Sequence, residues 1–143
     1  MSELNPGNHE PYNTPPPQRF QATPLPLLQK LTSAYKLWHS FLSHIPRLTR
    51  YSLGEKVNQL FIELIELTLA ATYSGREQKA AVVERASLKL DLLKYFVQIA
   101  WELKALDNQK FGALSQPLGE AGKMLGGWSK QLQKETPPRA GGA

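Results

Sequence analysis

Large apolar residues recur at alternating steps of three and four from Leu27 to Leu132, and this spacing constrains the fold more than any other feature of the sequence. Such steps place side chains on one face of an α-helix. No stretch alternates between apolar and polar residues in the way that a half-buried strand requires. We therefore expect an all-α protein.

Turn signals divide this pattern into four helices. The first is expected to end before Pro46, because the residue before a proline disfavours helical backbone. Two Ser-x-x-Glu sequences, starting at Ser52 and Ser74, predict capping boxes for the second and third helices. Asp107 is expected to cap the fourth. The pattern is typical of an up-down four-helix bundle with short loops, forming one domain over residues 24–134.

The third predicted helix, about residues 76–106, carries two apolar stripes. The first consists of Val83, Ala86, Leu90, Leu93, Val97 and Ala100. The second consists of Leu88, Leu92, Tyr95, Ile99, Leu103 and Leu106. At ~100° per residue the two stripes lie on nearly opposite sides of the helix. A helix in an isolated bundle needs only one apolar face, so we expect the protein to self-associate.

The fourth predicted helix breaks two local rules. A row of small residues lies beside its apolar seam: Gly112, Ser115, Gly119, Gly122, Gly126 and Ser129. Each glycine lowers helix propensity by ~1 kcal/mol, which close approach of a neighbouring helix would offset. Pro117 falls inside the same pattern and is expected to kink the helix or to split it near Ser115.

The two ends of the chain differ from the middle in composition. Residues 1–23 include Pro15-Pro16-Pro17 and few large apolar side chains, and residues 135–143 are similarly poor in them, so both segments are expected to be disordered. Residues 1–23 lack the basic start and apolar run of a secretory signal. No uncharged apolar stretch approaches the ~20 residues that span a bilayer. We expect a cytoplasmic protein with no membrane partner.

No residue pattern predicts catalysis, a metal or a cofactor. The chain has no cysteine, which excludes disulfides, thiolate ligands and thiol nucleophiles. His39 and His44 are five residues apart and do not share a helix face, unlike the spacing of zinc or di-iron ligands. Gly122-Lys123 lacks the earlier glycine and the following Ser or Thr of a phosphate-binding loop. We expect that the protein is not an enzyme on its own.

Charge favours a polyanionic or acidic partner. The chain has a net charge of +5, and residues 24–134 hold 15 basic and 9 acidic residues, a net +6. The candidate binding residues are Arg47, Arg50, Arg85, Lys89 and Lys94. A solvated helix face with intrahelical ion pairs remains an alternative, because Glu84, Asp91 and Glu102 share the third helix.

Several segments together resemble the accessory variability determinant of diversity-generating retroelements, over about residues 31–130. They are Ile45-Pro46-Arg47, Tyr51-Ser52-Leu53-Gly54, residues 86–96 (ASLKLDLLKYF), residues 102–106 (ELKAL) and residues 122–128 (GKMLGGW). The last segment is the most specific. The leucine-rich segments are common to helical bundles.

This resemblance implies a four-helix bundle that assembles into a homo-pentameric ring with a basic surface. It implies binding to the reverse transcriptase of the same element and to its template RNA or cDNA, during copying that introduces errors at adenines. The polymerase, and not the accessory protein, carries the active site. Lys94 matches a basic family position, whereas Gln98 stands where arginine is frequent, so Arg85 and Lys89 are expected to supply part of that charge.

Two further interpretations remain open from the sequence. Four-helix proteins encoded in ribosomal RNA intervening sequences share the bundle, but their serine-proline-asparagine signature after the second helix is not found here. A structural oligomerisation scaffold with incidental positive charge is the other alternative. It predicts no salt-sensitive binding to nucleic acid.

Overall fold

The computed structural model describes residues 24–135. Of the two segments predicted to be disordered, 1–23 and 135–143, only Glu135 falls inside the described part, as the last residue of a helix. The long helices are α2 (Pro24–Phe41), α4 (Leu53–Tyr73), α5 (Arg76–Glu102) and α6 (Asn108–Glu135). A 3-10 turn, η3 (Leu42–His44), and a single helical turn, α3 (Arg47–Arg50), join α2 to α4. Residues 24–135 contain no strand, which confirms the all-α prediction.

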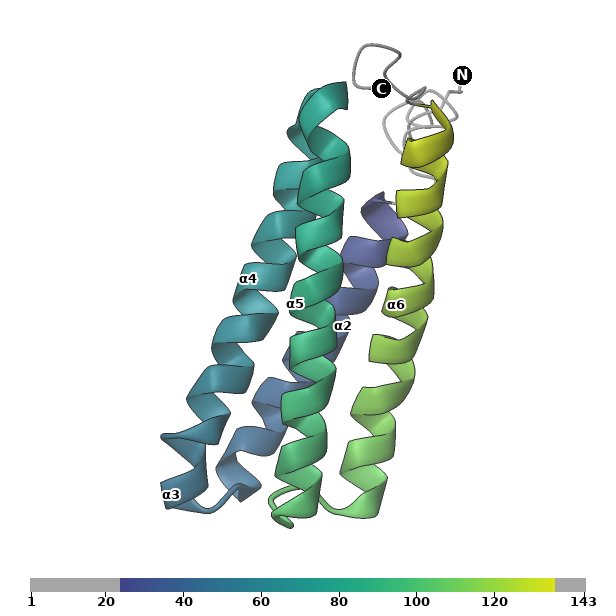
Figure 1. The fold of residues 1–143 in the computed structure, drawn as a ribbon. Helices are drawn as coiled ribbons and strands as arrows, with labels where there is room; N and C mark the ends of the chain where they lie inside the picture. Colours follow the sequence, from purple (N-terminus) through teal and green to yellow (C-terminus); the bar gives the residue numbers. More distant parts are fainter. Residues whose placement is uncertain (1–23, 136–143) are drawn as a thin grey trace, which may run out of the picture.

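The long helices run alternately up and down (Figure 1). In the bundle α4 packs against α5, α5 against α6, α6 against α2, and α2 against α4. Each long helix therefore packs against two others, and each of these four helix pairs is antiparallel. The start of α2 and the end of α6 lie at one end of the bundle, while α3 and the α5–α6 connection lie at the other (Figure 1).

The core is built from one apolar seam on each long helix, with residues at steps of three and four. The fully or almost fully buried residues of α2 and α4 are Leu27, Leu31, Ala34, Trp38, Val57, Leu60, Phe61, Leu64 and Ala71. Those of α5 and α6 are Val83, Ala86, Leu90, Leu93, Val97, Ala100, Leu114, Leu118, Ala121, Leu125, Trp128 and Leu132. Burying an aliphatic or aromatic side chain contributes about 1.5–3 kcal/mol, so these seams supply the main driving force for folding.

The connection from α2 to α4 differs from the expected simple loop after Pro46. Helix α2 ends at Phe41, and η3 continues the helical path to His44. Ile45 is 2% exposed and its N–H donates to the Leu42 carbonyl at 3.1 Å, so this residue closes the end of the core. The turn α3 then reverses the chain.

The predicted capping boxes are wrong at both positions. The Ser52 hydroxyl donates backwards to the Leu48 carbonyl at 2.9 Å, and Ser74 Oγ donates to the Ala70 carbonyl at 2.6 Å. Neither hydroxyl accepts from the first turn of the following helix, and Gly75 is the residue that precedes α5. Both serines complete the helical turn before them instead. The predicted break near residues 73–75 is nevertheless where α4 ends and α5 begins.

Helix α5 ends at Glu102, four residues earlier than predicted. Lys104 has a φ of 66°, and the N–H groups of Ala105 and Lys104 donate to the Ala100 and Trp101 carbonyls at 2.8 and 2.9 Å. This pair of bonds is the Schellman arrangement, in which a left-handed residue terminates a helix. The predicted cap of the fourth helix is confirmed, because Asp107 Oδ1 accepts from the Lys110 N–H at 2.8 Å.

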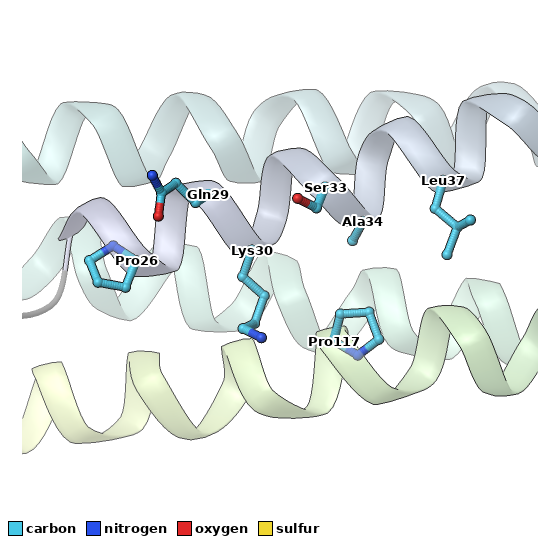
Figure 2. Close-up of a pocket in the computed structure, with 7 residues that line it drawn as sticks. All are labelled: Pro26, Gln29, Lys30, Ser33, Ala34, Leu37 and Pro117. Carbon is cyan, nitrogen blue, oxygen red and sulfur yellow. The ribbon is translucent and has the colours of Figure 1, made fainter.

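Pro117 does not split the last helix. Helix α6 continues through it from Asn108 to Glu135. The proline ring faces α2 across a shallow pocket of ≈460 Å³, opposite Lys30 (Figure 2). Lys30 in turn forms an ion pair with Glu120 at 2.5 Å, one helical turn beyond the proline. Because packing against α2 and this ion pair flank the site, the helix persists although Pro117 has no N–H to donate.

The predicted close approach along the glycine row is wrong for most of its members. A Cβ atom built on Gly112, Gly119 or Gly126 would meet nothing within 4 Å. Only Gly122 lies against a neighbouring helix, where a Cβ would be 3.5 Å from Leu90 Cδ2 and 3.7 Å from Lys94 Nζ. Close packing between the four described helices therefore explains the small residue at Gly122, but not at the other glycines of the row.

Candidate macromolecular interface

The five predicted basic residues do not form one patch. Arg47 and Arg50 lie on α3, at the end of the bundle where α2 leads into α4. Arg85 and Lys89 line a groove between α4 and α5. Lys94 lies on the opposite flank of α5, beside Gly122 of α6. The structure thus distributes the candidate charges over three places.

Arg50 is in large part a structural residue. Its Nη2 donates to the Ile45 carbonyl at 2.9 Å, and its Nε is shielded from solvent without a partner among residues 24–135. Its side chain passes over Gly54, where an added Cβ would lie 3.9 Å from Arg50 Cβ and 3.4 Å from the Thr49 carbonyl oxygen. Arg50 therefore fixes α3 against α4. Arg47 is exposed and is the freer cation of the two.

Lys89 is held by a carboxylate on the neighbouring helix. Its Nζ lies 2.8 Å from Glu63 Oε1, and Gln59 Nε2 donates to the other Glu63 oxygen at 3.1 Å. The hydrogen bond from Lys89, followed by that from Gln59, lowers the pKa of Glu63 below its usual value. The Glu63 carboxylate thus stays ionised and offsets the charge of Lys89. Of the two basic residues in this groove, Arg85 is therefore the more available to a binding partner.

A groove with a volume of ≈520 Å³ lies between α4 and α5. Its apolar lining residues are Leu67, Ala70, Leu88 and Leu92. Its charged lining residues, Glu63, Glu66, Arg85 and Lys89, carry both signs of charge.

The outward face of α5 continues this apolar surface along the helix. Leu88, Leu92 and Tyr95 are 60%, 41% and 60% exposed, and Leu103 beyond the helix end is 63% exposed. The first stripe of α5 is buried in the core, so the two-faced pattern is confirmed for these four residues. The other two members of the stripe differ: Ile99 is partly buried, and Leu106 is fully buried because the Schellman turn carries it back into the core. Contiguous exposed apolar residues of this kind mark interaction surfaces.

The three tryptophans occupy different environments. Trp38 and Trp128 are core residues. Trp101 is partly exposed, stacks on Phe111 with ring centroids 4.8 Å apart, and donates from Nε1 to Asn108 Oδ1 at 2.8 Å. These contacts tie the end of α5 to the start of α6.

Residues 24–135 contain no group of three or more His, Asp or Glu side chains placed to hold a metal ion. His39 lies beside Tyr35 with ring centroids 6.3 Å apart, whereas His44 lies next to Ser43. Gly122 and Lys123 are in the middle of α6, where no loop could wrap a phosphate. None of the described helices is long and apolar enough to cross a membrane.

The model of the bAvd-like family matches residues 25–132, which is nearly the whole described bundle. The chain belongs to the bAvd-like family. This confirms the resemblance to accessory variability determinants. Comparison with curated proteins and with solved structures gave no match.

Two features of this bAvd-like protein escaped sequence analysis. The first is the α4 side of the groove, where Leu67 is only partly buried and Ala70 is exposed. A second cavity lies where α2, α3 and α4 meet, and it brings Tyr35, Arg50 and Asn58 together. Neither leaves a spacing signal, because each is assembled from helices that are adjacent only after folding.

Proposed function

We propose that this bAvd-like protein is a non-catalytic accessory subunit of a diversity-generating retroelement. It binds the reverse transcriptase of the same element and its template RNA or cDNA in the cytoplasm, and it supports mutagenic copying without taking part in the chemistry. The observation that carries this proposal is the family match over residues 25–132. The excess of basic residues over residues 24–134 supports a polyanionic partner.

In this proposal the protein acts as a homo-oligomer, a pentameric ring. The exposed apolar face of α5, formed by Leu88, Leu92 and Tyr95, supports self-association because solvent exposure of such a face is unfavourable. Repeating a bundle of charge +6 around a ring concentrates positive potential beyond that of one subunit. The number of five subunits is proposed from the family resemblance alone. Measurement of the native mass tests it separately.

The basic residues divide into different proposed roles. Arg47, Arg85 and Lys94 are the candidates for direct phosphate contacts, because each is exposed on the described surface. Lys89 contributes less, since it is paired with Glu63. Arg50 mainly holds α3 in place. Phosphate contacts of this kind position nucleic acid without reading its bases, and each releases counterions.

Co-purification tests the accessory role directly. The tagged protein is isolated together with the reverse transcriptase encoded nearest its own gene, with and without ribonuclease treatment. We expect recovery of the polymerase; loss of it after ribonuclease would show that RNA bridges the two proteins. If no polymerase is recovered, the retroelement role is wrong, and a bundle protein of ribosomal RNA intervening sequences or a structural scaffold becomes the better interpretation.

A further inference from the structure

A small cavity of ≈260 Å³ lies at the corner where α2, α3 and α4 meet. We call it the corner cavity. It opens to solvent at the end of the bundle that carries α3, away from the apolar groove between α4 and α5. The lining residues with aromatic or polar groups are Tyr35, His39, Arg50, Tyr51, Glu55 and Asn58.

Aromatic side chains form part of its wall. Tyr35 is half-buried, and its ring packs against the fully buried Phe61 with centroids 5.5 Å apart. This contact with the core holds the Tyr35 ring in place. Tyr51 is 60% exposed at the C-terminal end of α3 and adds a second, more accessible ring. Rings of this kind form stacking contacts with flat heterocycles.

The polar groups of the corner cavity include both donors and acceptors. In the Arg50 guanidinium Nη2 donates one hydrogen to the Ile45 carbonyl and Nε is shielded from solvent, so the donors left for a ligand are those of Nη1 and the second hydrogen of Nη2. Glu55 offers acceptors only, and Asn58 offers both. The formal charges of Arg50 and Glu55 cancel, so a bare phosphate gains no net attraction here. A neutral heterocycle with donors and acceptors along its edge matches this set.

We propose that the corner cavity binds one unpaired guanine of the RNA that the protein contacts. This inference rests on the proposed RNA-binding function and adds base recognition to it. Guanine presents O6 and N7 as acceptors for an arginine, and its N1–H and N2–H groups are donors for a carboxylate. Uracil and cytosine present fewer such groups, and adenine lacks the paired donors that suit Glu55. Arg47 is exposed on α3, the element that also carries Arg50.

The test uses the full chain and four RNA hairpins that differ only in one unpaired loop nucleotide, G, A, C or U. Their affinities are measured by fluorescence anisotropy over a salt series. We expect the guanine hairpin to bind on the order of tenfold more tightly, the discrimination typical of one base contact. The variant Glu55→Gln should abolish this preference and leave the salt slope unchanged. Its matched control, Glu84→Gln, removes the same charge from an exposed position on α5, outside both the corner cavity and the apolar groove, and should retain the preference.

A second measurement separates this inference from the proposed function. Guanosine and adenosine monophosphates carry the same phosphate, so NMR shifts of the Asn58 amide and His39 ring are compared on adding each to the full chain. Shifts seen only with the guanosine nucleotide would support guanine binding in the corner cavity even if no RNA is bound. Equal affinity for all four hairpins, with an intact salt dependence, would overturn base recognition and leave the proposed function standing. Absence of any RNA binding would count against the proposed function instead.

Discussion

The Nζ atom of Lys89 lies 2.8 Å from Oε1 of Glu63, and this ion pair joins α5 to α4 along the edge of the apolar groove. Both side chains are about one third exposed, at 35% and 33%. Solvent screening therefore limits the pair to less than about 1 kcal/mol of stability. Its larger consequence concerns binding, because a cation engaged by a carboxylate is less available to a phosphate.

The ion pair leads to a prediction about RNA binding. The slope of log affinity against log salt counts the phosphates that a protein neutralises. Replacing Lys89 by Gln should change this slope less than the same change at Arg85. Glu63→Gln, which frees Lys89, should strengthen binding and make the slope steeper. Equal slopes for the Lys89 and Arg85 variants would contradict the assignment.

The outward face of α5 leads to a prediction about assembly. The double variant Leu88→Glu/Leu92→Glu places charges on this face and should reduce the native mass, measured by light scattering after gel filtration, because burying unpaired charges is unfavourable. Helix content by circular dichroism should be unchanged, since both residues lie outside the core. Leu90→Ala is the control on the opposite face and should lower the free energy of unfolding by about 2–5 kcal/mol. An unchanged native mass in the double variant would exclude this face from the interface.

Lys104 adopts a left-handed backbone conformation that glycine adopts without strain. Lys104→Gly should therefore raise the free energy of unfolding by roughly 1 kcal/mol, measured by chemical denaturation. Lys104→Ala is the informative control, because alanine keeps the strained φ and should bring no such gain. A gain of equal size with alanine would show that the lysine side chain, and not the backbone, is unfavourable here.

Asp107 gives a prediction about pH. The Lys110 backbone N–H, followed by the Lys110 side chain, holds the pKa of the Asp107 carboxyl below its model-peptide value of 3.8. A carboxyl with a lowered folded-state pKa contributes stability above the unfolded-state value, and that contribution is lost as the pH falls through the folded-state value. The stability difference between wild type and Asp107→Asn should thus be constant at neutral pH and shrink below about pH 4. A stability difference that does not change with pH would show that ionisation of Asp107 contributes nothing to the capping of α6.

Trp38 has an Nε1–H that is buried without a hydrogen-bond partner among the described residues. Trp38→Phe removes this unsatisfied donor and keeps an aromatic ring, so we expect a loss of less than about 1.5 kcal/mol in the free energy of unfolding. Trp38→Ala should cost about 3–5 kcal/mol, because the side chain is fully buried. A large loss with phenylalanine would indicate that Nε1 does have an acceptor in solution.

The sequence predicted the core better than it predicted the helix ends. Positions such as Leu31, Leu64 and Leu90 follow from helical periodicity, which depends only on local geometry. The Ser-x-x-Glu signals failed because the hydroxyls of Ser52 and Ser74 donate to carbonyl groups in the preceding turn. Serine side chains form such bonds as readily as capping bonds, so the residue type alone does not distinguish the two. The end of α5 was misplaced because a lysine occupies the left-handed position where glycine is the usual signal.

The candidate site was less predictable, because it depends on contacts between helices. Lys89 and Glu63 form an ion pair although they are 26 positions apart in the sequence, and residue spacing along a helix does not predict such a pair. The division of roles between Arg47 and Arg50 depends on the Ile45 carbonyl, which faces Arg50 only after α3 has formed. What the sequence did predict was the second apolar stripe of α5, since a helix with two apolar faces is visible in periodicity alone.

The up-and-down course of the helices has a practical consequence for anyone who handles this molecule. The start of α2 and the end of α6 lie toward the same end of the bundle (Figure 1). The corner cavity, lined by residues of α2, α3 and α4, lies toward the other end. Along α2 the start of the helix and the cavity are separated by about 20 Å, at 1.5 Å per residue. A fluorophore, affinity tag or fusion partner attached before α2 or after α6 therefore leaves the opposite end open, and a surface-tethered molecule presents it to solution.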